Sequence, residues 1–223
     1  MTESTKFLGV IIDQNLTFCS HISYIKGKIS RALGILYKAK RIFNKKTLHT
    51  LYNSFIHPLF MYCVCVWANV PRLHLDPLEK LQKRAVRVIA GAKYLAHTAP
   101  LFKELTIMNL INIYVYNMLM ILYKYHHDSL PDIFNSFFSR NGDIHSRDTR
   151  HQMLFRVPQQ TPATLTKRLR YVGVTIHNFF VTRLNFNVKI SPFKKQAKAY
   201  LLDNDVTFLL YPNDDSKYLL QQS

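Results

Sequence analysis

Two stretches of the chain carry apolar residues at helical spacing, and these stretches constrain the possible folds most strongly. The first is predicted to be a helix that Ser20 caps and that runs to about Phe43. The second is predicted to start at Asp76-Pro77 and to stop at Gly91. Their apolar faces consist of Ile22, Ile25, Ile29, Leu33, Leu36 and Phe43 in the first, and of Leu78, Leu81, Ala85, Val88 and Ile89 in the second. The chain is therefore expected to be mainly α.

Shorter elements are predicted around these two helices. A strand over Lys6–Asp13, a turn at Asp13–Asn15 and a return over Leu16–Phe18 would form a small N-terminal β-hairpin. Additional helices are expected from near Lys46 to Pro58, over 60–67, 99–105, 109–127, 130–138, 173–180 and 191–202, with one strand at 152–157. The expected domains are a hairpin at 1–19, a helical unit at 20–91, a second helical layer at 92–139 and a basic, partly extended segment with a terminal helix and an acidic tail at 140–223.

The charge of the chain points to a polyanionic partner. Thirty Lys and Arg residues stand against thirteen Asp and Glu, which gives a net charge of +17. A surplus of this size suits nucleic acid or an acidic membrane face, and composition alone does not decide between them.

The cations also fall on the polar sides of the predicted helices. Lys80, Lys83, Arg84 and Arg87 share one arc of the second helix, and Arg31, Lys38 and Arg41 share one side of the first, followed by Lys45 and Lys46. Arg147 and Arg150 belong to a less ordered basic segment, in which Tyr171 is a candidate for base stacking. Phosphate contact is the predicted role of these cations, and an ordinary solvated helix face is the alternative.

Cysteine and histidine give no sign of a metal site. Three cysteines make no even disulfide framework, which suggests a reducing intracellular compartment, cytoplasmic or nuclear. Cys63 and Cys65 lie in an apolar run and are expected to be buried thiols, while Tyr62 and Trp67 are expected in the core. No apolar run reaches the roughly 20 residues that a membrane span needs.

Five blocks of the sequence, taken in order, resemble the region after the catalytic palm of Jockey-like non-LTR (LINE) retrotransposon reverse transcriptases. They are Lys6-Phe7-Leu8-Gly9-Val10 with His21-Ile22, Leu51–Pro58 with Tyr62 and Trp67, Leu78–Ile89, His145–Arg150, and Ser191–Leu202. His177-Asn178 departs from the Trp-Asn pair usual in the family.

The resemblance implies a thumb-like helical bundle that lies along the backbone of an RNA–DNA duplex. It also implies a primer-grip-like role for Lys6, Phe7, Leu8 and Gly9. The family's catalytic aspartate pair is expected upstream of Lys6, so no catalysis and no cofactor are expected here, and Mg²⁺ is expected only in the missing palm. Asp214-Asp215 is interpreted as a solvated acidic tail.

Two kinds of function remain open at this point. The first is a fragment of a reverse transcriptase that binds RNA or RNA–DNA duplex without sequence preference, with the palm as a further partner. The second is a non-enzymatic interaction module, or a relic reading frame, whose basic faces meet an acidic protein or an anionic membrane. The sequence does not predict an oligomeric state.

Overall fold

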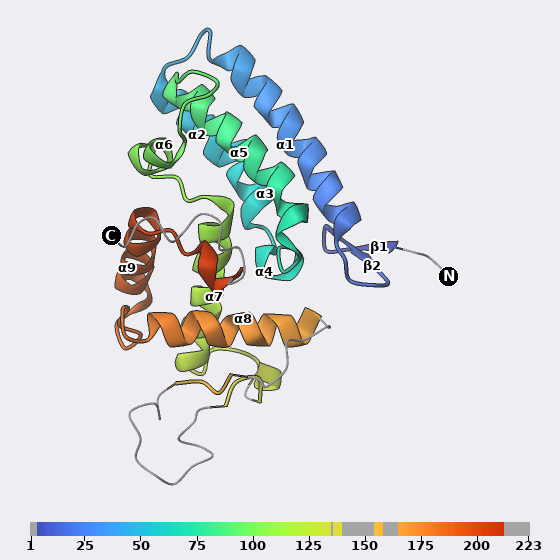
Figure 1. Ribbon diagram of the computed structural model, residues 1–223, viewed down its shortest axis with the longest axis vertical. Coiled ribbons are helices and arrows are strands. Elements are labelled where there is room, and N and C mark those ends of the chain that lie inside the picture. The colour runs from blue at the N-terminus through green and yellow to red at the C-terminus, as the bar shows by residue number, and fades with distance from the viewer. Residues whose placement is uncertain (1–3, 135, 140–153, 158–164, 212–223) are drawn as a thin grey trace. The chain divides into compact units, whose positions relative to one another are not determined.

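The computed structural model describes residues 4–134, 136–139, 154–157 and 165–211 (Figure 1). The chain is mainly helical with a small N-terminal hairpin, as predicted. It divides into two compact units, with the boundary between Tyr114 and Val115, inside helix α7 (Leu110–His126). The four domains expected from the sequence stay predictions. None of the described helices is long and apolar enough to traverse a lipid bilayer.

The N-terminal hairpin forms with a turn different from the predicted one. Strand β1 (Ser4–Phe7) pairs antiparallel with β2 (Val10–Asp13), and the chain reverses at Leu8 and Gly9. Both turn residues have positive φ, 45° and 85°, as a tight two-residue hairpin turn requires. The continuous strand predicted over Lys6–Asp13 is therefore wrong, because Gly9 allows the reversal in the middle of an apolar run.

Asp13 holds the loop that leads from the hairpin into helix α1 (Cys19–Ala39). Its carboxylate accepts hydrogen bonds from the backbone N–H groups of Asn15, Thr17 and Phe18, at 3.2, 2.9 and 2.7 Å. Phe18 is the N-cap residue, so the predicted cap at Ser20 is wrong, and Ser20 lies inside the helix. The loop satisfies its own donors through Asp13 and needs no serine cap.

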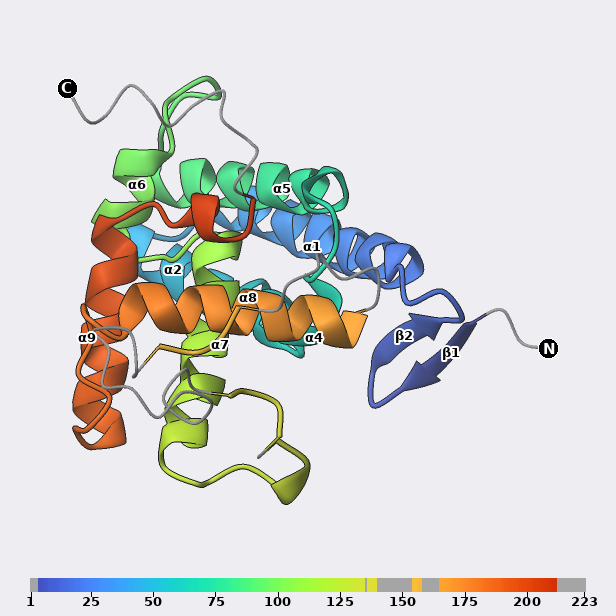
Figure 2. The same ribbon diagram turned by 60° about the horizontal axis from the view of Figure 1, so that its bottom comes forward.

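Helices α1 and α5 (Arg72–Ala90) lie side by side and form the largest helix–helix contact of unit 1 (Figures 1 and 2). The predicted apolar faces are buried in both helices, with Ile29 and Leu78 fully inaccessible. Phe43 is half exposed, because α1 ends at Ala39 and leaves it in the following turn. Burying a Leu or Ile side chain of this kind stabilises the fold by roughly 1.5–3 kcal/mol.

Three shorter helices complete this side of unit 1: α2 (Lys45–Phe55), α3 (His57–Met61) and α4 (Val64–Trp67). Pro58 lies in the first turn of α3, directly after α2 ends, so the predicted break at this proline is confirmed. Trp67 is fully buried as predicted, and its indole N–H donates to the carbonyl oxygen of Tyr62 at 2.7 Å. Tyr62 itself is 51% exposed, so its predicted place in the core is wrong.

Gly91 ends α5 in the left-handed conformation, with φ 69°, which confirms the predicted stop signal. Helix α6 (Ala99–Glu104) follows at the predicted place. The predicted start of α5 is wrong by about a turn and a half. The helix begins at Arg72, and Pro77 lies inside it, where the buried neighbours Leu75 and Leu78 keep the chain helical.

The described residues of unit 2 contain the rest of α7, the helices α8 (Leu165–Phe180) and α9 (Ile190–Asp203), and the 3₁₀ turns η1 (Asp132–Phe134) and η3 (Thr207–Leu209). Helix α8 begins before the predicted helix at 173–180. The helix predicted over 130–138 is wrong, because the described residues there form only η1. Residues 154–157 carry a single bridge at Phe155, and the rest of the strand predicted at 152–157 lies outside the described residues.

The departure at His177-Asn178 is accommodated by an aromatic cluster in unit 2. The His177 ring is fully buried and stacks on Phe155, with centroids 3.7 Å apart, and its Nε2 lies 2.8 Å from Nε2 of His126. The Asn178 amide pairs with both backbone groups of Phe155, at 2.8 Å each, as a neighbouring strand would. Imidazole thus fills this position as a flat, polar ring.

Candidate nucleic-acid interface

The first group of exposed cations lies on α1 and just after its end. Ile22, Ile25, Ile29, Leu33 and Leu36 form the buried stripe of this helix. Arg31 and Lys38 lie away from that stripe, and Arg41 follows in the turn after Ala39; all three side chains are exposed. None of them forms an ion pair with any residue that the structure describes.

The second group lies on α5, a helix that is buried around most of its circumference. Lys80 and Arg84 are exposed, and neither forms an ion pair within the described segments. Lys83 and Arg87 are half-buried at the margins of this strip. The four predicted cations of this helix therefore separate into two that face solvent and two that contact the protein.

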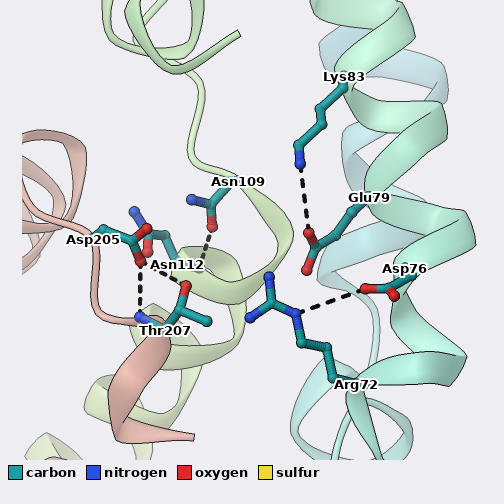
Figure 3. A network of polar contacts seen from close by, with 8 residues as sticks. All are labelled: Arg72, Asp76, Glu79, Lys83, Asn109, Asn112, Asp205 and Thr207. Carbon is teal, nitrogen blue, oxygen red and sulfur yellow. Dashed lines mark hydrogen bonds and ion pairs between the residues drawn. The ribbon is translucent and has the colours of Figure 1, made fainter. Parts of the chain in front are cut away.

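Figure 3 shows two ion pairs along α5. Lys83 Nζ lies 3.9 Å from Glu79 Oε2, and Arg72 Nε lies 3.7 Å from Asp76 Oδ1, both at i,i+4 spacing. Asp76 thus lies inside the helix, and the prediction that it caps the helix is wrong. Partly exposed pairs of this type contribute only a few tenths of a kcal/mol, but they lower the charge that Lys83 presents.

Arg87 acts on the loop after α5. Its Nε donates a hydrogen bond of 2.9 Å to the carbonyl oxygen of Ala96. This contact fixes the guanidinium against its own chain, although its other nitrogens keep hydrogen-bonding capacity. Arg87 is accordingly a weaker candidate for phosphate contact than Lys80 or Arg84.

Lys45 and Lys46 begin α2, where Asn44 caps the helix by accepting from the backbone N–H of Thr47 at 3.0 Å. Two lysines in a first turn oppose the helix dipole, which favours negative charge there. Lys45 forms an ion pair with Glu104 at the end of α6, which offsets part of this cost. Lys46 is exposed and forms no ion pair with the described residues.

The hairpin tip is exposed as well. Phe7 and Leu8 are 63% and 73% exposed, and the Tyr62 hydroxyl donates to the carbonyl oxygen of Leu8. Exposed aromatic and aliphatic groups beside cations are typical of surfaces on which bases stack. Lys6 lies on β1, so the predicted primer-grip-like residues occupy the end of one strand and its turn.

Several predicted residues lie outside the described residues. These are Arg147 and Arg150 in the basic segment, and Asp214-Asp215 in the tail. Tyr171 is half-buried on α8, so its ring is only partly available for stacking.

The potential metal ligands of the described residues meet in pairs at most, such as Cys19 Sγ and His74 Nδ1 at 3.7 Å. No group of three or more His, Cys, Asp or Glu side chains there is placed to hold a metal ion. Cys63 is exposed, so its predicted burial is wrong; it opens α4 in the left-handed conformation, with φ 50°. Cys65 is more enclosed, and burial raises the pKa of its thiol to about 12, with the nearby Cys63 adding to the rise.

Sequence reasoning missed three residues that the structure brings together near the hairpin. His21, Tyr24 and Lys28 share one side of α1 and line a cavity with Lys6. Their spacing of three, four and seven residues was a visible helical signal. Their proximity to Lys6 could not be predicted, because the sequence prediction placed the hairpin turn at Asp13–Asn15 instead of at Leu8 and Gly9.

A mainly helical bundle with exposed cations on two helices is typical of a nucleic-acid-binding region. Comparisons with known proteins show which family the chain is similar to. The chain is 25% identical over 75% of its length to an RNA-directed DNA polymerase from the mobile element jockey of Drosophila funebris. It is 29% identical over 48% of its length to the jockey polymerase of Drosophila melanogaster, and 24% identical over 46% to a probable RNA-directed DNA polymerase from transposon X-element of the same species.

These curated homologues are non-LTR retrotransposon polymerases, so the family resemblance found in the sequence is confirmed. The chain spans only 12–18% of the length of these relatives and is thus homologous to a part of them. No family model matches the chain, and no solved structure matches it.

Proposed function

We propose that this chain is a nucleic-acid-binding part of a retrotransposon RNA-directed DNA polymerase, and that it grips the backbone of RNA or RNA–DNA duplex without reading its sequence. The observation that carries the proposal is the set of exposed cations on the adjacent helices α1 and α5. Arg31, Lys38, Lys80 and Arg84 all lack an ion pair among the described residues.

The electrostatics of these helices favours binding of a polyanion. Like charges on one face repel each other, whereas surface helices usually mix signs at i,i+4 spacing. A phosphate chain neutralises such a face and releases counterions, which is the main source of sequence-independent affinity. Contacts of this kind position a duplex and leave its bases unread.

The proposed contact residues fall into four groups. Arg31, Lys38, Arg41, Lys46, Lys80 and Arg84 supply the principal phosphate contacts. Lys45, Lys83 and Arg87 contribute less, because each already binds a group of the protein. Arg147 and Arg150 are proposed from the sequence alone, and the primer-grip-like residues Lys6–Gly9 would meet the nucleic acid at the hairpin.

In this proposal the chain supplies no polymerase chemistry of its own. Nucleotide transfer needs carboxylates that hold two metal ions roughly 4 Å apart. Among the residues the structure describes, no group of three or more His, Cys, Asp or Glu side chains is placed to hold a metal ion. The catalytic aspartates and their Mg²⁺ would belong to the palm region of the polymerase.

Fluorescence anisotropy with a labelled RNA–DNA duplex tests the proposal. We expect saturable binding at 50 mM salt that weakens steeply, and linearly in the logarithm of salt, as salt is raised. Two duplexes of unrelated sequence should bind equally. Undetectable binding at low salt, or displacement of the duplex by anionic vesicles but not by unlabelled RNA, would contradict it in favour of a membrane-facing module.

A further inference from the structure

Unit 1 contains a cavity of about 330 Å³ between the hairpin, the first turns of α1 and helix α3. Its walls include Lys6, Leu8 and Gly9 from the hairpin, His21, Tyr24, Ile25 and Lys28 from α1, and Leu59 and Tyr62 beyond them. None of these residues is acidic. The cavity is distinct from the exposed cations of Arg31, Lys38, Lys80 and Arg84, none of which lines it.

Two ammonium groups converge on one tyrosine in this cavity. Lys28 Nζ lies 4.6 Å from the centroid of the Tyr24 ring, and Lys6 Nζ lies 5.5 Å from it. Hydrogen bonding to Lys28 and the charges of both lysines lower the pKa of the Tyr24 hydroxyl, although desolvation opposes them. Neither lysine forms an ion pair in the described segments, so both charges face the cavity uncompensated by a carboxylate.

His21 adds a buried donor to the same wall. Its Nδ1 accepts a hydrogen bond of 3.2 Å from the backbone N–H of Ile11, so the neutral ring carries its proton on Nε2. The side chain is only 2% exposed, and Nε2 has no hydrogen-bond partner among the described residues. Burial lowers the pKa of His21, which keeps the ring neutral and the Nε2 proton available. A buried donor without an acceptor is unfavourable, and an anion that accepted this proton in the cavity would remove that cost.

The remaining walls are apolar and suit more than a bare phosphate ion. Leu8, Ile25, Leu59 and the Tyr62 ring line them, and the volume lies at the lower end of the range for small-molecule pockets, roughly 300–1,000 Å³. The positive φ of Gly9, 85°, disfavours other residues at this turn, whereas an added Cβ would make only an ordinary contact of 3.5 Å with the Tyr62 ring. These residues offer apolar contacts to a flat ring system, and Lys6 and Lys28 in the same lining offer contacts to a charged group.

We propose that this cavity binds one nucleotide, with its phosphate held by Lys6, Lys28 and the Nε2–H of His21 and its base against Leu8 and Tyr62. The inference rests on the proposed function in that it assumes a nucleic-acid partner, and it adds a pocket separate from the helical grip. The nucleotide phosphate comes either from a free mononucleotide or from a strand that enters the cavity.

Calorimetric titration of the full chain with adenosine monophosphate, adenosine, inorganic phosphate and a short single-stranded oligonucleotide tests the pocket. Adenosine monophosphate should bind, phosphate more weakly, and adenosine not measurably. If the oligonucleotide binds at least as tightly as the mononucleotide, and Lys28→Gln weakens both, the source is a strand; tighter mononucleotide binding points to a free nucleotide. Histidine NMR should show the His21 ring shifting on saturation.

Lys28→Gln and Lys6→Gln should each weaken mononucleotide binding about ten-fold, as expected for a lost charged hydrogen bond. Lys26→Gln is the matched control: it removes the same charge from an exposed position on α1 that does not line the cavity, and should change affinity less than two-fold. Equal binding of adenosine and its monophosphate, or full affinity in Lys28→Gln, would overturn the inference. Duplex anisotropy run in parallel separates the two proposals, because salt-dependent duplex binding without mononucleotide binding defeats only the pocket.

Discussion

The side-chain amide of Gln82 on α5 donates a hydrogen bond of 2.9 Å to the hydroxyl of Tyr52 on α2, inside the core of unit 1. The same nitrogen donates to the carbonyl oxygen of Met108 at 3.0 Å. Gln82 is therefore fixed inward, and Lys80 and Arg84, each two residues away, lie about 160° around the helix from it. The buried polar contact thus sets which side of α5 carries the exposed cations.

Replacing Tyr52 by Phe should destabilise unit 1 by about 1 kcal/mol, because it removes one acceptor from a buried amide donor. Trp67, the single tryptophan, is fully buried in the same unit and reports its unfolding in urea by fluorescence. Tyr94→Phe makes the same chemical change at a 66% exposed ring and should leave the midpoint unchanged. Equal midpoints for both variants would show that the Gln82–Tyr52 contact contributes nothing.

Replacing Asp13 by Ala should lower the free energy of unfolding by about 1 kcal/mol, the typical loss when a side chain that caps backbone N–H groups is removed. Its carboxylate holds three backbone N–H groups of the loop before α1, whereas the side chain of Asn15 in the same loop is exposed. Asn15→Ala is therefore the control and should be nearly neutral. A larger effect from Asn15→Ala than from Asp13→Ala would refute this account of the loop.

The stability from Asp13 should also depend on pH. Burial raises the pKa of this carboxyl, but hydrogen bonds from Thr17, Phe18 and Asn15 outweigh burial and leave the pKa below its ordinary value of 3.8. A depressed folded-state pKa means that the stabilisation is complete above the unfolded value and is lost as pH falls through the folded one. The gap between the native chain and Asp13→Ala should therefore close in acid, and a gap that widens below pH 4 would count against it.

The three thiols should differ in reactivity. Cys19 and Cys63 are exposed, whereas burial raises the pKa of Cys65 to about 12, so its thiolate is scarce at pH 8. Titration with a disulfide reagent should show two fast groups and one slow group, and unfolding in urea should make all three fast. Cys65→Ala should abolish only the slow phase. A fast phase of three thiols in the folded chain would contradict the structure.

Much of unit 1 follows from its sequence because its signals are local. The apolar stripe of α1, the break at Pro58 and the stop at Gly91 each depend on residues within one or two turns. The start of α5 was mispredicted for a tertiary reason. Pro77 favours a helix start, but burial of Leu75 and Leu78 in the core outweighs the hydrogen bond that a proline inside a helix forfeits.

The sequence predicted which cations belong to the candidate site, but it did not predict which of them are engaged by other groups of the protein. Helical spacing alone placed Lys80, Lys83, Arg84 and Arg87 on one arc. Lys83 pairs with Glu79, which lies one turn before it, and Arg87 donates to the carbonyl oxygen of Ala96. The position of that carbonyl depends on the fold of the loop and could not be predicted from helical spacing. The cavity beside His21 was hidden for a similar reason, because it needs the turn at Leu8 and Gly9.

The most direct test of the account compares two double variants of α5 in the duplex anisotropy experiment. Lys80→Gln with Arg84→Gln removes two exposed cations, and Arg72→Gln with Lys83→Gln removes the same charge from the two ion pairs of Figure 3. The account predicts that the first pair lowers the salt slope of log affinity by about 2, roughly 1 for each lost phosphate contact. The second pair should change the slope by less than half as much. Equal losses from both pairs would show that net charge alone drives binding, and would contradict a grip built on the exposed cations.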